Sequence, residues 1–331
     1  MNVIKSLLTL ALMSVSSVMA AELPAPTDAP VRIGTLASGT LNWEMATVRN
    51  EGLDESNGIR LVGSDLASPE AGRIGLQGKS LDVIVSDWIW VARQRQQGED
   101  FVFAPFSGSH GALMVPGDSP IRGVGDLAGK RLGVAGGGLD KNWLLLKAMA
   151  RKTGQPDPEL AAKVSFAAPP LLNQELQQGR LDAVLTYWNY AARLEAQGYR
   201  QVLDGRQIQM ALGIESDVPA LGYVFREGWA RANPAAITGF LKAAAQARKS
   251  LCQSDAAWQK VIPLTQESDS RIQSALRRHY CAGSVADHLG AGELKAAQEI
   301  FRQVGGAAPG TDATLPAGVF WNAGSASVET R

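Results

Sequence analysis

Hydrophobic and polar positions follow two alternating periods along the chain. Short apolar runs at residues 31–36, 59–62 and 81–85 predict buried strands. Apolar residues spaced three and four apart within 42–51 and 69–77 predict helices between them. Strands that alternate with helices imply a mainly parallel sheet flanked by helices, so the sequence predicts an α/β fold.

This pattern occurs twice. Leu81–Trp88 reads LDVIVSDW, and Leu181–Trp188, 100 residues later, reads LDAVLTYW. Two further pairs lie upstream, in matching order: Arg32-Ile33-Gly34 with Arg131-Leu132-Gly133, and Asn42-Trp43 with Asn142-Trp143. Repetition on this scale indicates two similar α/β lobes with a cleft between them. We expect one lobe to comprise residues 30–110 and 222–331, and the other residues 111–221.

Ligands of parallel sheets bind at the carboxyl ends of strands, in the loops that follow. Residues 38–40 and 86–88 occupy that position in the first lobe, and residues 187–190 do so in the second. Trp88 and Trp188 follow polar residues after a strand and are expected to stack on a ligand, facing each other across the cleft. Trp43 and Trp143 fit a role as core anchors equally well.

The second lobe carries Gly136-Gly137-Gly138 between a strand and a helix. Such a loop lets a small ligand approach the backbone, although a tight turn without a ligand explains it too. It matches neither GxGxxG nor a P-loop. Asp140 is placed to cap the following helix, and Glu44 is expected to be a solvated helix residue.

The carboxylates offer a further possibility. If Asp87, Asp140 and others converge, the ligand would carry a cationic or hydrogen-bond-donating group. Carboxylate oxygens also suit hard metal ions, but the spacing contains no metal-binding loop motif. The sequence therefore predicts neither a metal nor a cofactor.

Composition limits the possible functions. The chain has 331 residues, a formal net charge of zero, 45% hydrophobic residues and 19% charged residues, as is typical of a globular protein. Neutral charge without a Lys/Arg run argues against nucleic-acid binding. Lys5 and an apolar stretch at residues 7–18 predict a signal peptide over residues 1–20, cleaved near Ala20, and hence an exported, periplasmic protein.

The chain has two cysteines, Cys252 and Cys281. In an oxidising compartment such a pair is expected to form a structural disulfide, the alternative being two separate buried thiols. An enzyme is not expected. Ser109 beside His110 would need an orienting acid that the sequence does not place, and a polar hinge is the simpler interpretation.

The segments Asp118-Ser119-Pro120-Ile121, Gly129-Lys130-Arg131-Leu132-Gly133-Val134 and Gly179-Arg180-Leu181-Asp182-Ala183 resemble periplasmic solute-binding proteins of ABC importers. The resemblance is to the sulfonate/taurine/nitrate and thiamine-pyrimidine branch, known as SsuA/THI5-like. It extends from about Val31 to Leu251. It implies the type II two-lobe binding-protein fold, two crossings between the lobes and a cleft that closes on its ligand.

Carried onto this chain, the resemblance places ligand contacts at ten positions: Ser38, Gly39, Thr40, Asp87, Trp88, Ser107, Gly137, Gly138, Trp188 and Asn189. Sulfonate binders of this branch usually have an aromatic-proline pair where this chain has Trp188-Asn189, and the motif regions show little basic character. The ligand class therefore stays open.

The expected function is capture of a small polar or aromatic solute and its delivery to an ABC transporter permease by a monomeric carrier. A secreted hydrolase-like enzyme and a ligand sensor on the same scaffold are the alternatives.

Overall fold

The computed structural model describes residues 30–37, 39–286, 288–304 and 313–322. The expected signal peptide and its cleavage site near Ala20 lie outside the described residues. Within them, no helix is both long and apolar enough to cross a membrane.

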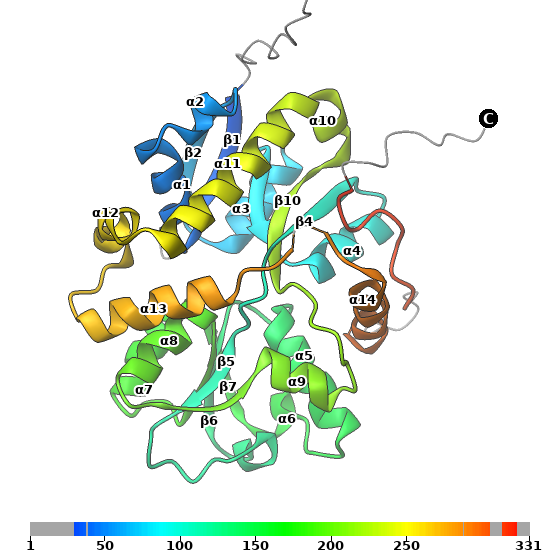
Figure 1. Ribbon diagram of the computed structural model, residues 1–331. Coiled ribbons are helices and arrows are strands. Elements are labelled where there is room, and N and C mark those ends of the chain that lie inside the picture. Colours follow the sequence, from blue (N-terminus) through cyan, green and yellow to red (C-terminus); the bar gives the residue numbers. More distant parts are fainter. Residues whose placement is uncertain (1–29, 38, 287, 305–312, 323–331) are drawn as a thin grey trace, which may run out of the picture.

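Ten strands form two five-stranded sheets, one in each lobe (Figure 1). The sheet of lobe 1 has the order β2-β1-β3-β10-β4, with bounds Arg60–Leu66, Pro30–Leu36, Val83–Ser86, Leu221–Arg226 and Phe101–Ser107. The sheet of lobe 2 has the order β7-β6-β8-β5-β9, with bounds Lys163–Ala167, Arg131–Ala135, Ala183–Thr186, Ala112–Val115 and Arg200–Asp204. The two orders correspond strand for strand, which confirms the predicted two-lobe fold.

Each sheet is mixed, where the sequence predicted a mainly parallel one. In lobe 1, β1 pairs in parallel with β2 and β3, whereas β10 runs antiparallel to β3 and β4. In lobe 2, β6 pairs in parallel with β7 and β8, and β5 runs antiparallel to β8 and β9. The reversed strands β5 and β10 are the ones that follow a connection from the other sheet, so they enter from the cleft side.

Fourteen α-helices are present among the described residues. In lobe 1 and its connections they are α1 Leu41–Asn50, α2 Leu53–Ser56, α3 Pro69–Gln77, α4 Trp88–Gln96, α10 Glu227–Ala232 and α11 Pro234–Gln253. In lobe 2 they are α5 Lys141–Lys152, α6 Pro158–Ala161, α7 Pro169–Gln177, α8 Trp188–Ala196 and α9 Gly205–Ala211, with a 3-10 turn at Val124–Leu127. The last three are α12 Asp255–Thr265, α13 Ser270–Ala282 and α14 Ala291–Val304.

The sequence repeat has a physical counterpart at the outer end of each sheet. Asp82 accepts hydrogen bonds from the backbone nitrogen, Nε and Nη2 of Arg32, at 2.8, 3.0 and 2.6 Å. Asp182 accepts the same three bonds from Arg131, at 2.8, 3.1 and 2.6 Å. The repeated Arg and Leu-Asp positions thus fix the register between β1 and β3 and between β6 and β8.

Helices α13 and α14 connect the two lobes on opposite sides (Figure 1). Arg193 of α8 pairs with Glu267 at 2.7 Å and donates to the Thr265 carbonyl at 2.8 Å, just before α13. His279 of α13 lies 2.8 Å from Glu195 of α8. On the other side, the Val304 carbonyl of α14 accepts a bond from Arg93 of α4.

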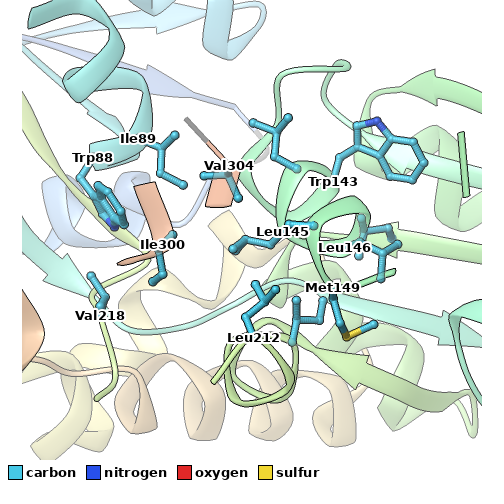
Figure 2. Packing of buried hydrophobic residues seen from close by; sticks show 14 of the residues in the cluster. Trp88, Ile89, Trp143, Leu145, Leu146, Met149, Leu212, Val218, Ile300 and Val304 are labelled. Carbon is cyan, nitrogen blue, oxygen red and sulfur yellow. The ribbon is translucent and has the colours of Figure 1, made fainter. Parts of the chain in front are cut away.

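The largest apolar cluster also runs across the lobes. Figure 2 shows Trp88 and Ile89 of lobe 1, Ile300 and Val304 of α14, and Leu145 of lobe 2 within it. All five are at most 3% exposed. Because α14 fills the space between α4 and α5, burial of apolar surface holds the lobes together there.

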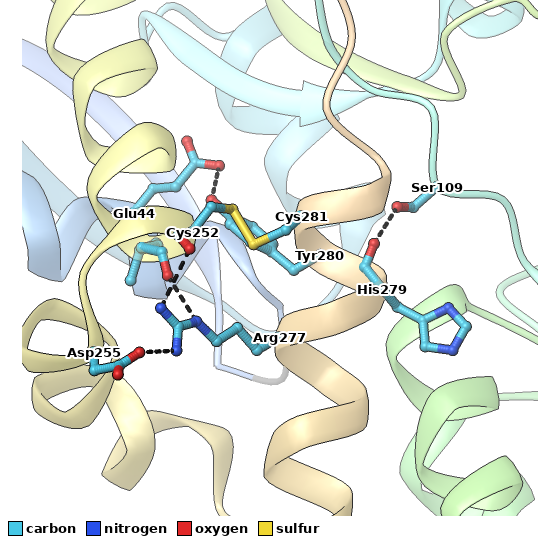
Figure 3. Close-up of a disulfide and its surroundings, with 9 residues drawn as sticks. Glu44, Ser109, Cys252, Asp255, Arg277, His279, Tyr280 and Cys281 are labelled. Carbon is cyan, nitrogen blue, oxygen red and sulfur yellow. Dashed lines mark hydrogen bonds and ion pairs between the residues drawn. A yellow bond between two sulfur atoms is a disulfide. The ribbon is translucent and has the colours of Figure 1, made fainter.

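Cys252 and Cys281 form a disulfide that joins α11 to α13 (Figure 3). The predicted pairing is therefore present in the structure. The bond ties helix α13, which rests on lobe 2, to the long helix of lobe 1.

We predict that removing this disulfide lowers the free energy of unfolding. The bridge spans a sequence separation of 29 residues, which corresponds to about 3 kcal/mol in the chain-entropy account. Urea unfolding of the Cys252→Ser/Cys281→Ser double variant should show a loss of this order relative to the oxidised wild type. Equal midpoints for the two proteins would contradict the prediction.

A second prediction concerns Lys79, which adopts a left-handed backbone conformation with φ of 60°. Gly179 occupies the equivalent place in lobe 2, with φ of 69°. A side chain is strained in this region, so Lys79→Gly should stabilise the protein by about 1 kcal/mol in urea unfolding. Lys79→Ala is the matched control and should bring no such gain, because alanine keeps the Cβ atom.

Candidate ligand-binding cleft

A cavity lies between the lobes, with walls from both of them. The space open to the centre of a water molecule is about 140 Å³, roughly ten times the minimum for one water. Lobe 1 contributes Leu36, Leu66, Ile84 and Phe106, and lobe 2 contributes Tyr187 and Trp188. The mixed apolar and polar wall suits a small organic molecule.

Four helices begin at the cavity, two from each lobe. Their N-cap residues are Thr40 of α1, Asp87 of α4, Asp140 of α5 and Tyr187 of α8, and all four line the cavity. Thr40 and Asp140 are 100 residues apart, as are Asp87 and Tyr187, so the arrangement follows the sequence repeat. The strands deliver these helices to the cleft because each helix follows a strand that ends there.

The four N-termini differ in how they are capped. Asp87 accepts a bond from the backbone nitrogen of Trp90 at 2.8 Å, and Asp140 accepts one from that of Asn142 at 2.9 Å. Thr40 and Tyr187 make no side-chain capping bond. The predicted helix-cap role of Asp140 is confirmed, and the same residue also faces the cavity.

Arg73 of α3 supplies a positive charge beside Asp87. Its Nη2 lies 3.2 Å from Asp87 Oδ2, and its guanidinium group lies 5.1 Å from the centroid of the Trp90 ring. The pair is mostly buried, with side chains 21% and 10% exposed. Arg73 thereby neutralises the carboxylate that caps α4.

Asp140 is the more perturbed acid. Burial raises the pKa of Asp140, and the nearby Asp87 raises it further, whereas Lys141 lowers it. Asp140 keeps partial exposure because one side of it opens into the cavity. The raised pKa means that the surroundings stabilise the negative charge of Asp140 less well than water does.

Tyr187 lines the cavity near Asp140. Burial raises the pKa of Tyr187, with a further contribution from Asp140, so its hydroxyl is a donor at neutral pH. Gly136 adopts φ of 82°, and a Cβ atom there would lie 2.9 Å from the Tyr187 hydroxyl. Glycine at this position therefore lets the strand end approach the ring.

Five of the ten expected ligand positions line the cavity: Gly39, Thr40, Asp87, Trp188 and Asn189. Four others do not: Trp88, Ser107, Gly137 and Gly138. Ser107 is directed to the connection between the lobes, where its hydroxyl accepts a bond from the Ser109 backbone nitrogen at 3.1 Å. Gly137 and Gly138 lie in the turn before Asp140, and Ser38 lies outside the described residues.

Trp88 differs most from expectation. It is 3% exposed and packs against Phe320, with ring centroids 5.9 Å apart, in the apolar cluster of Figure 2. Trp88 is the first residue of α4, and its side chain points away from the cleft. Asp87, which precedes it, faces the cavity. Trp88 and Trp188 consequently do not face each other across the cavity.

Trp188 instead belongs to an aromatic cluster that joins the lobes. Its ring centroid lies 6.3 Å from those of both Trp43 and Tyr280, and Trp43 lies 5.4 Å from Trp258. Trp43 and Trp143 are 2% and 0% exposed, which agrees with a core role for both.

Glu44, expected to be solvated, is fully buried behind this cluster. It accepts hydrogen bonds from the hydroxyls of Tyr223 and Tyr280, at 2.5 and 2.7 Å. Arg248 Nη1 lies 3.5 Å away. Burial raises the pKa of Glu44 despite these partners. The helical spacing of α1 did not reveal this burial, because the partners of Glu44 come from β10, α11 and α13, which lie far away in the sequence.

The sequence did not single out Arg73, Lys141 and Asn142 as site residues. Asn142 was visible only as half of a repeated Asn-Trp pair, and Arg73 gave no signal because Asn173 stands at the equivalent position of lobe 2. Among the described residues, no group of three or more His, Cys, Asp or Glu side chains could hold a metal ion.

The geometry around Ser109 does not resemble a catalytic dyad. The Ser109 hydroxyl donates to the carbonyl of His279 at 3.3 Å, and His110 Nε2 lies 3.2 Å from Asp217 Oδ1. His110 therefore has an acidic partner, Asp217. Their contact links the two segments that cross between the lobes, the one between β4 and β5 and the one between α9 and β10. The described hydrogen bonds include none between Ser109 and His110.

The fold is the two-lobe fold of periplasmic binding proteins, as two solved structures show. The alkanesulfonate-binding protein SsuA from Xanthomonas axonopodis pv. citri, bound to MOPS, is 17% identical, with a TM-score of 0.67 over 88% of this chain and 98% of that one. The periplasmic aliphatic sulphonate-binding protein SsuA from Escherichia coli is 19% identical, with a TM-score of 0.65 over 83% and 85%.

The family model described as NMT1/THI5 like matches residues 81–255, more than half of the chain. The protein belongs to this family. No curated protein matches the sequence. The fold also occurs in the desulfurization enzyme DSZB, at 14% identity and a TM-score of 0.51 over 83% and 91% of the chains, so fold alone does not separate carriers from enzymes.

We predict that the contribution of Glu44 to the free energy of unfolding falls as pH rises from about 4, because Glu44 binds its proton more tightly when folded than when unfolded. The decrease should level off once the pH exceeds the raised pKa of folded Glu44. Urea unfolding across this range should show that the free energy of unfolding of the wild type, measured relative to that of Glu44→Gln, falls as pH rises. Glu55→Gln, on the exposed face of α2, is the control and should follow the wild type.

Proposed function

We propose that the protein is a non-catalytic carrier that captures a small, partly apolar solute in the cleft and delivers it to an ABC transporter permease. The observation that carries the proposal is the cavity between the lobes, where four helix N-termini from the duplicated units meet. Family membership and the likeness to sulfonate-binding proteins support it.

The cleft offers two kinds of contact to such a solute. Apolar walls from Leu36, Ile84 and Phe106 would remove its hydrocarbon part from water. The backbone N–H groups at the start of α1 and α8, without side-chain caps, can donate to acceptor oxygens. Opening of the cleft would require α13 or α14 to shift against lobe 2, since both contact it.

The same proposal covers location and boundaries. We infer export to the periplasm after cleavage near Ala20, and lobes divided into residues 30–110 with 222–331, and 111–221. The membership of the strands in the two sheets supports this division. Two alternatives remain within the fold: a ligand sensor would differ only in its partner, and a hydrolase would need a nucleophile activated otherwise than by His110.

A test is to purify the protein natively from its own cells and to identify small molecules released on denaturation by mass spectrometry. A stoichiometric solute that raises the melting temperature when added back to stripped protein is the expected result. A cleft that yields no solute, with no melting shift across a broad metabolite library, would contradict the carrier function.

Filling the cavity supplies a matched pair of variants. Leu221 lines the cavity at the start of β10, so Leu221→Trp should abolish the copurifying solute by occupying its space. Leu264→Trp places the same side chain on α12, where Leu264 is 42% exposed and away from the cavity. That variant should retain the solute in full, and loss from both variants would contradict binding in this cavity.

A further inference from the structure

We propose that the solute carries a protonated amino group bound by Asp140, so that the cleft selects an organic ammonium compound over an alkyl sulfonate. The inference rests on the proposed function, because it assigns the chemical class of the molecule held in the same cavity.

The first support is the remaining acceptor capacity of Asp140. Its Oδ1 receives a backbone hydrogen bond from Asn142 at 2.9 Å, and the backbone N–H of Trp143 also interacts with the carboxylate. A carboxylate has about four acceptor positions, and Asp140 lines the cavity with part of its surface open. Capping of α5 therefore leaves the carboxylate able to accept from a ligand, and an ammonium group offers three donors.

A second, independent acceptor lies next to it. Asn142 also lines the cavity and is only 2% exposed. Its amide oxygen has no hydrogen-bond partner within the described part of the chain. An unpaired buried acceptor is costly, and a ligand N–H group would relieve that cost, whereas a sulfonate has no donor to offer.

The third support is that carboxylates already occupy two of the helix N-termini where an anion would bind. Asp87 caps α4 and Asp140 caps α5. Both acids, from opposite lobes, line the cavity. Because Arg73 already pairs with Asp87, a sulfonate would be repelled mainly by the carboxylate of Asp140, whereas an ammonium group would pair with that carboxylate.

Two cations oppose these acids. Arg73 also lines the cavity, where it pairs with Asp87 at 3.2 Å and lies against the Trp90 ring, while its buried Nε has no hydrogen-bond partner among the described residues. Lys141 lies beside Asp140, lines the cavity and is 9% exposed. Lys141 is the residue that would bind an anionic head group if the assignment to Asp140 were wrong.

The experiment compares three probes that share one chain and differ in the head group: hexylammonium, hexan-1-ol and hexane-1-sulfonate. Stripped full-length protein is titrated with each by calorimetry. Hexylammonium should bind at least about tenfold more tightly than the other two, as expected for one charge-assisted hydrogen bond. Hexan-1-ol binding as tightly as hexylammonium would overturn the proposal.

Variants assign the effect to a residue. Asp140→Asn removes the charge but keeps a good helix cap, so the protein should fold while the preference for hexylammonium over hexan-1-ol disappears. Asp157→Asn changes the N-cap of α6, outside the cavity, and should leave all three affinities unchanged. An unchanged preference in Asp140→Asn would overturn the proposal, as would sulfonate binding that Lys141→Gln abolishes.

The two proposals fail differently. If a solute copurifies but hexylammonium binds no better than hexane-1-sulfonate, the amine assignment is wrong and the carrier function stands. If no solute copurifies and no probe binds, the carrier function fails together with the assignment.

Discussion

The organisation of the cleft depends on satisfying the backbone N–H groups at four converging helix N-termini. The first N–H groups of a helix have no partner within the helix, and here α1, α4, α5 and α8 all begin at one cavity. Asp87 and Asp140 satisfy α4 and α5 with their own carboxylates. This local need places two carboxyl groups in the cavity wall.

The shape of the cleft depends on elements that do not line it. Helix α13 rests on α8 through Arg193 and His279, and α14 fills the other side between α4 and α5. Trp188 belongs to both systems, because it lines the cavity and packs against Trp43 and Tyr280. A shift of α13 on lobe 2 would therefore move the wall of the cavity, because Trp188 contacts Tyr280 of α13 and also lines the cavity.

Features set by local sequence could be predicted, and those set by distant packing could not. The repeated Leu-Asp and Arg positions indicated two lobes because each pair fixes a strand register within its own lobe. The cap at Asp140 was evident from its position before a helical pattern. Trp88 and Glu44 were misjudged because Phe320, Tyr223 and Tyr280, more than 175 residues away, decide their surroundings.

The two lobes share the interactions that hold their sheets together, but they differ at the residues that line the cavity. The Arg–Asp pairs at the outer ends of the sheets have the same geometry in both lobes, to within 0.1 Å. At the cleft the equivalent residues differ: Thr40 stands against Asp140, and Asp87 against Tyr187. Each lobe thus has one acidic cap and one neutral cap, but on opposite helices. The two units keep one fold while differing at the residues that a solute would contact, which is what an asymmetric ligand bound between two similar lobes requires.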